Sequence, residues 1–165
     1  MLEVKIFTLY PDLFPGPLDI GIFKKAKENK IWNLKVINIR DYSKDNHGTV
    51  DDTPFGGGNG MLLRPDILAS ALDKNIKKGE KIIYLSPRGK KFDQNVARSF
   101  SKEKNLNLIC GHFEGVDQRA IEILGFQEIS IGDYVLSGGE IAAQVLVEGC
   151  IRLIPGVLGL SLIHI

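Results

Sequence analysis

Short apolar segments alternate with longer amphipathic segments along the chain. Residues typical of β-strands occupy 4–9, 34–39, 81–85, 106–110 and 128–131. Apolar positions at helical spacing occupy 18–30, 67–76, 92–104, 119–124 and 141–154. Because strands and helices alternate, the pattern predicts βαβ units. It therefore predicts an α/β fold with a mostly parallel sheet and helices on both faces.

Local signals predict where two of these helices begin. Pro65 and Asp66 precede the helix at 67–76, and proline is favoured in the first turn of a helix. Ser137 and Glu140 match the capping box S-x-x-E ahead of the last helix. We therefore expect the Ser137 oxygen to accept from an early backbone N–H, while Glu140 reaches back to the N-cap.

Composition indicates one ordinary domain. The 165 residues are 44% hydrophobic and 25% charged, which is enough for one core. The net charge of +1 gives no electrostatic argument for strong nucleic-acid binding. Basic clusters at 24–30 and 88–91 are interpreted as solvated faces.

No feature of the chain indicates export, a membrane span or a metal site. The first ten residues lack the apolar run of a signal peptide, and no segment approaches the length of a membrane helix. His47, His112 and His164 show no ligand spacing with one another or with the cysteines. Cys110 follows an apolar strand and is interpreted as a core residue. We expect a cytoplasmic protein with no membrane contact.

A glycine-rich stretch at 55–61 is the first departure from this regular pattern. Four glycines in five positions are typical of positive φ or close backbone approach. Met61 stands where a Rossmann fingerprint needs glycine, and the Lys-Ser/Thr of a P-loop is absent. The stretch is either a flexible hairpin tip or a functional loop. In the second case Gly57, Gly58 and Gly60 are the candidate substrate contacts.

Three segments with turn chemistry follow predicted strands, at 85–89, 110–115 and 131–136. In an open α/β sheet, ligands bind beyond the carboxyl ends of the strands. Glycines there let backbone groups approach a ligand, and Leu85, Tyr134 and Leu136 supply apolar walls. The three segments together predict a small-molecule pocket.

Five blocks that contain these features resemble the bacterial tRNA (guanine-N1)-methyltransferases, in the order that the family has them. The blocks are 51–61, 84–87, 110–117, 130–140 and 154–159, and the similarity runs from about Leu2 to Gly159. The block at 130–140, Ser-Ile-Gly-Asp-Tyr-Val-Leu-Ser-Gly-Gly-Glu, is the most specific.

The resemblance implies a SPOUT-class fold with a C-terminal trefoil knot, an exception to the usual absence of knots. It implies a homodimer whose active sites lie between subunits. It also implies methyl transfer from S-adenosylmethionine to N1 of the tRNA guanosine just 3′ of the anticodon. Whether Mg²⁺ takes part does not follow from the sequence.

The same resemblance assigns the site residues. Arg152 matches the family's catalytic arginine, and a cation near guanine O6 would stabilise the negative charge that develops there. The donor site would comprise Tyr84, Leu85, Ser86, Pro87, Gly111, Glu114, Ile131, Gly132, Asp133, Tyr134, Val135 and Leu136.

Beyond Gly159 the chain departs from the family pattern. We expect residues 1–159 to form the donor-binding domain and 160–165 to be a non-native, adapter-derived tail. The family's catalytic aspartate and C-terminal tRNA-binding domain are then absent, which predicts donor binding with little or no turnover. One alternative is a non-catalytic knotted module that dimerises or binds RNA. Another is a nicotinamide oxidoreductase, which Met61 disfavours.

Overall fold

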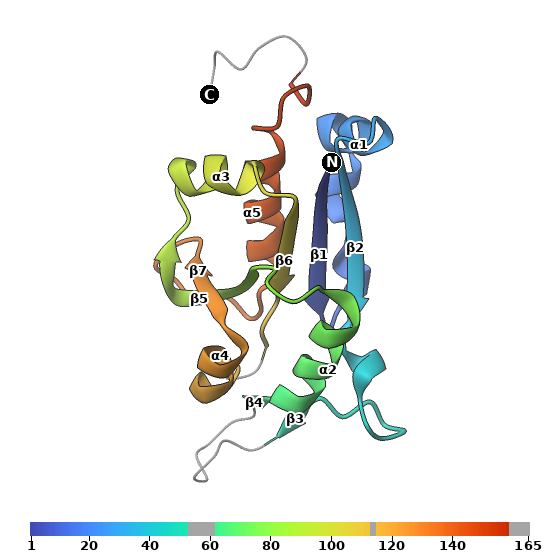
Figure 1. The fold of residues 1–165 in the computed structure, drawn as a ribbon, viewed down its shortest axis with the longest axis vertical. Helices are drawn as coiled ribbons and strands as arrows, with labels where there is room; N and C mark the ends of the chain where they lie inside the picture. Colours follow the sequence, from blue (N-terminus) through green and yellow to red (C-terminus); the bar gives the residue numbers. More distant parts are fainter. Residues whose placement is uncertain (53–61, 113–114, 159–165) are drawn as a thin grey trace.

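Five parallel strands form the central sheet of the protein. The computed structural model describes residues 1–52, 62–112 and 115–158. The strand order is β2-β1-β6-β5-β7, and each neighbouring pair is parallel (Figure 1). The strands are β1 Leu2–Thr8, β2 Trp32–Asn38, β5 Ile82–Lys91, β6 Asn105–Ile109 and β7 Phe126–Ser130. Two further strands, β3 Asp51–Asp52 and β4 Leu62–Leu63, pair with each other in antiparallel fashion.

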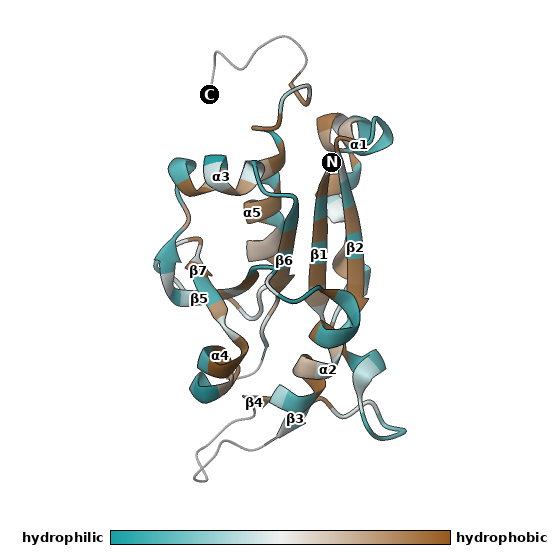
Figure 2. Cartoon of the chain, viewed as in Figure 1, coloured by the Kyte–Doolittle hydropathy of each residue, from teal (hydrophilic) through white to brown (hydrophobic). Residues whose placement is uncertain are grey.

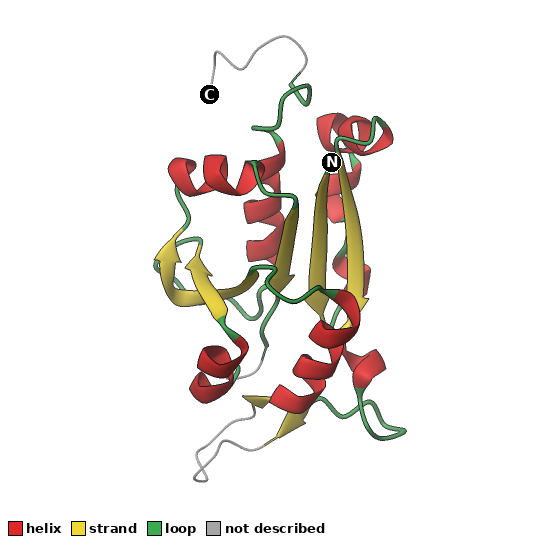
Figure 3. Cartoon of the chain, in the orientation of Figure 1, coloured by secondary structure: helices red, strands yellow, loops and turns green. Residues whose placement is uncertain are grey.

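Helices cover both faces of this sheet, as the alternating pattern predicted (Figure 3). They are α1 Gly21–Glu28, α2 Pro65–Asn75, α3 Gln94–Ser101, α4 Gln118–Leu124 and α5 Glu140–Ile151. Short 3-10 turns lie at Pro11–Leu13, Gly16–Asp19 and Ile39–Tyr42. Buried residues of α1, α3 and α5 share one core, and those of α2 and α4 share the other.

The strands contribute to both cores by simple alternation. Val4 and Ile6 of β1 face the core with α5, whereas Phe7 faces the core with α2. Leu108 and Ile109 of β6 divide in the same way. This is the arrangement expected when side chains alternate across a parallel sheet that is buried on both sides. Figure 2 shows apolar residues concentrated on these strands and on α5.

The helix predicted at 18–30 is shorter than expected. Residues Gly16–Asp19 form a 3-10 turn, Ile20 is extended, and α1 begins only at Gly21. Gly21 has φ +63°, a left-handed conformation that interrupts the helix and that glycine adopts without strain.

The strand predicted at 81–85 continues to Lys91 instead of ending at the turn residues. Both Leu85 and Lys90 pair with Ile129 of β7, so residues 86–89 form an irregular excursion within β5. At Gly89 an added Cβ would overlap the backbone of Glu128 and Ile129. The Pro-Arg-Gly sequence therefore makes a close crossing over β7 and not a strand end.

The capping box predicted at the start of α5 is wrong. Gly139 is the N-cap residue, and no side chain caps the helix. Glu140 instead turns into the protein, where its two carboxylate oxygens meet Thr8 and His112. A buried partner thus displaces the local interaction that the S-x-x-E pattern favours.

The connection from β7 to α5 passes from the sheet edge to the middle of the sheet. After Ser130 it passes the end of β5, and the Gly139 N–H donates to the carbonyl of Gly111, just beyond β6 (3.0 Å). α5 then packs on α3 and β1. The trefoil knot that the resemblance implies for this part of the chain stays a prediction.

We expect Gly89→Ala to weaken the fold, because a methyl group there forces β5 and β7 apart. Overpacking of this kind costs about 1–3 kcal/mol in the free energy of unfolding. Chemical denaturation measures the change. Lys90→Ala, an exposed neighbour on the same strand, is the control and should change the free energy by less than about 0.5 kcal/mol. Equal stability of the two variants would contradict the close crossing.

Candidate functional site: a cavity at the strand ends

The carboxyl ends of β5, β6 and β7 enclose one cavity of about 390 Å³. All three predicted segments contribute to its wall. The predicted residues that line it are Tyr84, Leu85, Ser86, Pro87, Gly111, Ile131, Gly132, Tyr134, Val135 and Leu136. Asp133 lies in the same loop but is exposed and is not part of the wall. Glu114 lies outside the described residues.

Close packing of a tyrosine against glycines shapes the floor of the cavity. A Cβ at Gly111 or at Gly115 would come within 2.8 Å of the Tyr84 hydroxyl oxygen. Burial raises the pKa of Tyr84, and the nearby charge of Glu128 raises it further. The phenol therefore stays neutral at physiological pH and acts as a wall and hydrogen-bonding group, not as an anion.

Apolar side chains form the open rim of the cavity. Tyr134, Val135 and Leu136 are 52%, 84% and 40% exposed, respectively. These three consecutive side chains expose apolar area to water unless something covers them. A ligand or a second protein surface at this rim would bury them, at roughly 25 cal/mol per Å² of apolar area.

Two charged or polar residues of the wall, His112 and Arg88, were not among the predicted site residues. Both lie within the predicted strand-end segments 110–115 and 85–89, and the place of His112 directly after Gly111 was the available signal. Its Nε2 lies 2.5 Å from Oε1 of the buried Glu140. Arg88 is on the β5 excursion and reaches Glu128 at 3.9 Å.

Neither cysteine provides a reactive thiol. Burial raises the pKa of Cys110 well above its usual value, and the charge of Glu140 acts in the same direction. Burial raises the pKa of Cys150 to about 12. The interpretation of Cys110 as a core residue is therefore confirmed, since both thiols stay protonated and solvent does not reach them.

Arg152 does not lie near the cavity. It is the C-cap of α5, whereas the cavity contacts the first turn of that helix at Ala142. α5 has 12 residues, so its two ends are roughly 18 Å apart. Within one copy of the chain, the structure does not bring the predicted catalytic arginine together with the predicted donor site.

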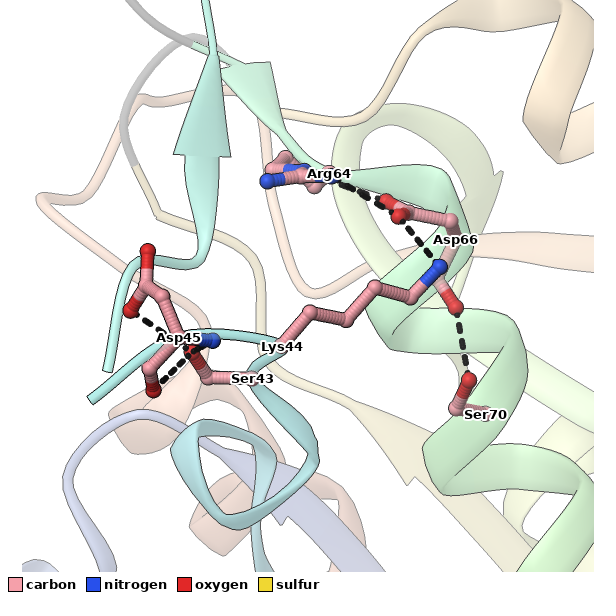
Figure 4. A network of polar contacts seen from close by, with 6 residues as sticks. All are labelled: Ser43, Lys44, Asp45, Arg64, Asp66 and Ser70. Carbon is pink, nitrogen blue, oxygen red and sulfur yellow. Dashed lines mark hydrogen bonds and ion pairs between the residues drawn. The ribbon is translucent and has the colours of Figure 1, made fainter. Parts of the chain in front are cut away.

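Ion pairs hold the two segments that flank the glycine-rich stretch (Figure 4). The Asp66 carboxylate, in the first turn of α2, accepts from Arg64 (2.9 Å) and pairs with Lys44 (3.0 Å). Burial alone would raise the pKa of Asp66, but these two cations outweigh it and lower the pKa to about 2. Gly57, Gly58 and Gly60 themselves lie outside the described residues.

Within 1–52, 62–112 and 115–158, no three His, Cys, Asp or Glu side chains gather as metal ligands would. No helix in those same ranges has the length and apolar character needed to cross a membrane.

Comparison with known proteins identifies close relatives. A family model described as tRNA (Guanine-1)-methyltransferase TrmD matches residues 2–164. A tRNA (guanine-N(1)-)-methyltransferase of Pelagibacter ubique (strain HTCC1062) is 61% identical over 159 residues, covering 96% of this chain and 70% of the relative. Its namesake in Ehrlichia canis (strain Jake) is 48% identical, covering 94% and 67%. That of Wolbachia pipientis (strain wPip) is 49% identical, covering 94% and 68%.

The Asp66 cluster predicts a component of acid sensitivity. Because the folded-state pKa lies below the ordinary 3.8, the ion pairs stabilise the protein above about pH 4. That stability is lost as the pH falls through about 2. Asp66 is partly exposed, so the effect is at most about 1 kcal/mol. Melting temperatures between pH 5 and pH 2 should fall less steeply for Asp66→Asn than for the wild type.

Asp73→Asn is the matched control for this prediction, because Asp73 is an exposed carboxylate on the same helix. Its melting temperature should follow the wild-type curve across the same pH range. Identical slopes for the Asp66 and Asp73 variants would show that the cluster contributes nothing to stability.

Proposed function

Because the chain belongs to the tRNA (guanine-1)-methyltransferase family, we propose that its strand-end cavity binds S-adenosylmethionine. The reaction would be methylation of N1 of the guanosine just 3′ of the anticodon in tRNA. The single observation that carries the proposal is the convergence of three of the five family blocks, at 84–87, 110–117 and 130–140, on one cavity. A family resemblance in sequence alone does not require those blocks to meet.

The residues of the cavity fit the proposed donor. Its volume of about 390 Å³ lies within the range of small-molecule sites, about 300–1,000 Å³. Tyr84, Leu85 and Leu136 offer apolar surface, and glycines expose backbone groups at the strand ends. S-adenosylmethionine, when bound, supplies an activated methyl group, so the protein has mainly to hold it in line with the acceptor.

The acceptor requires chemistry of a different kind. N1 of neutral guanine carries a proton, and its removal places negative charge on O6. A guanidinium close to O6 would stabilise that charge, which is the role we propose for Arg152. Since Arg152 lies at the far end of α5, it would reach the cavity of a partner subunit and not its own.

One face of α5 supports this arrangement. Ile141, Val145 and Arg152 recur at helical spacing, and Ile141 and Val145 are 62% and 45% exposed. These two exposed apolar side chains, with the exposed Glu148 on the same face, offer a surface that a protein partner would cover. We propose that two copies of the chain pack through this face as a homodimer, which carries Arg152 of each copy toward the other.

A local basic patch beside the cavity would attract the proposed tRNA substrate. Arg88 on the β5 excursion and Lys90 and Lys91 directly after it are exposed, and Arg88 lines the cavity. The chain as a whole carries a net charge of only +1, so this local patch and not the overall field would attract phosphate.

Calorimetric titration of the purified chain tests donor binding. We expect saturable binding of S-adenosylmethionine and none of NAD, because the cavity lacks a dinucleotide fingerprint. Binding of NAD instead would favour an oxidoreductase. If neither ligand binds to a chain with a folded circular dichroism spectrum, the non-catalytic module becomes the better reading and the proposed donor site is wrong.

Sedimentation velocity tests the α5 interface. The wild type should sediment as a dimer, and Val145→Asp as a monomer, because a carboxylate would be buried in the apolar contact without a partner. Ile123→Asp is the control, since Ile123 is even more exposed but lies on α4. It should remain dimeric. A dimeric Val145→Asp variant would place the interface elsewhere.

A further inference from the structure

A buried carboxylate links the first strand of the sheet to the wall of the cavity. Glu140 is 3% exposed and sits in the first turn of α5. Its Oε2 accepts from the Thr8 hydroxyl at 2.7 Å, and its Oε1 meets His112 Nε2 at 2.5 Å. Thr8 and Glu140 are 132 residues apart in the chain. The carboxylate therefore connects three elements, β1, α5 and the segment after β6.

Thr8 orients this contact from outside the cavity. It is fully buried at the end of β1, and it is not among the residues that line the cavity. Its hydroxyl oxygen accepts from the Tyr10 N–H at 2.9 Å, which directs the hydroxyl proton toward Glu140. The hydroxyl thus has a fixed donor and a fixed acceptor, so its position defines that of the carboxylate.

The His112 imidazole is held by Tyr10 and by the loop before α5, in addition to Glu140. The Tyr10 ring lies against the imidazole, with centroids 4.8 Å apart and planes tilted by 57°. A Cβ at Gly138 would overlap the same imidazole. The loop before α5 therefore rests directly on the His112 ring, and only glycine at 138 permits that approach.

The backbone of the cavity wall depends on that ring. The Gly139 N–H donates to the Gly111 carbonyl at 3.0 Å, and a Cβ at Gly139 would lie 2.9 Å from Cys110 Cα. Gly111, His112, Gly138 and Gly139 all line the cavity. A shift of His112 would therefore move both strand-end segments that form this wall.

Simple stabilisation does not account for a carboxylate in this position. Desolvating a carboxylate costs several kcal/mol, and well-packed apolar side chains in its place are often as stable. What a buried charge with two directional partners provides is a single geometry. Here that geometry is the wall of the site.

We propose that Thr8 and Glu140 form a positioning relay, which holds His112 and the adjoining wall in the geometry that binds the methyl donor. The inference rests on the proposed function for the identity of the ligand. Thr8 touches neither donor nor acceptor, and it acts only through Glu140 and His112.

Two substitutions at position 8 separate the relay from general packing. Thr8→Val keeps the shape and removes the hydroxyl, whereas Thr8→Ser keeps the hydroxyl. Calorimetry with S-adenosylmethionine should show a dissociation constant about 5- to 10-fold higher for Thr8→Val, the factor that one hydrogen bond of ordinary strength represents. Thr8→Ser should bind within about twofold of the wild type.

A second readout needs no ligand. Hydrogen exchange of the Gly139 amide, followed by NMR, reports directly on its bond to Gly111. It should be at least about fivefold faster in Thr8→Val than in Thr8→Ser. Ile67→Val, a buried change in the other core, controls for lost stability, and both its Gly139 exchange and its donor affinity should match the wild type.

The outcomes separate the two proposals. A wild type that does not bind S-adenosylmethionine defeats the proposed function, while the exchange comparison still decides the relay. If Thr8→Val differs no more than Ile67→Val in exchange and affinity, the relay is refuted. If Thr8→Val does not fold, Glu140→Gln takes its place. It keeps the size, loses the charge and should shift both readouts in the same direction; no shift would overturn the proposal.

Discussion

Close approach of chain segments at a few glycines near the strand ends is the constraint on which the rest of the structure depends. Gly89 lets the β5 excursion cross β7, Gly139 lets the last loop reach the end of β6, and Gly111 accommodates Tyr84. At Gly89 and Gly139 a Cβ would collide with backbone atoms, which cannot easily move, and at Gly111 it would collide with the Tyr84 side chain. The cavity exists because three chain segments that are far apart in sequence can come within contact distance there.

Such close packing leaves little room for side chains of the loops to fix their position. Buried polar side chains from neighbouring elements do so instead. Glu140 of α5 and Thr8 of β1 are both buried. They contact each other, and Glu140 contacts His112 of the cavity wall. The Gly139–Gly111 backbone bond completes the connection. Rigid elements of the sheet and the helix therefore determine the geometry of a wall that is itself made of loops, as precise sites require.

Local pattern was sufficient to predict most of the fold. Alternation in residues 4–9 and 106–110 and helical spacing in 67–76 and 141–154 identify elements whose burial depends on period alone. The same signals placed Tyr84, Gly111 and Tyr134 at strand ends, and the structure brings them to one cavity. The assignment of individual residues to the donor came from the family blocks and stays a proposal.

Two of the wrong predictions have a common physical cause, because each depends on a partner distant in the chain. The S-x-x-E pattern at 137–140 favours a cap, but Thr8 and His112 draw Glu140 inward. Ser86–Gly89 has the composition of a turn, yet β7 lies close enough to extend the pairing to Lys91.

The single helix α5 carries residues from each separate part of the proposed site. Its first turn carries Glu140 and contacts the cavity, its exposed face carries Ile141 and Val145, and its end carries Arg152. A helix of this length behaves as a rigid rod, so a partner that docks on the exposed face also fixes the first turn. The proposed dimer contact, the carboxylate behind the wall and the proposed role of the arginine are then not independent features. A displacement of α5 would alter all three together.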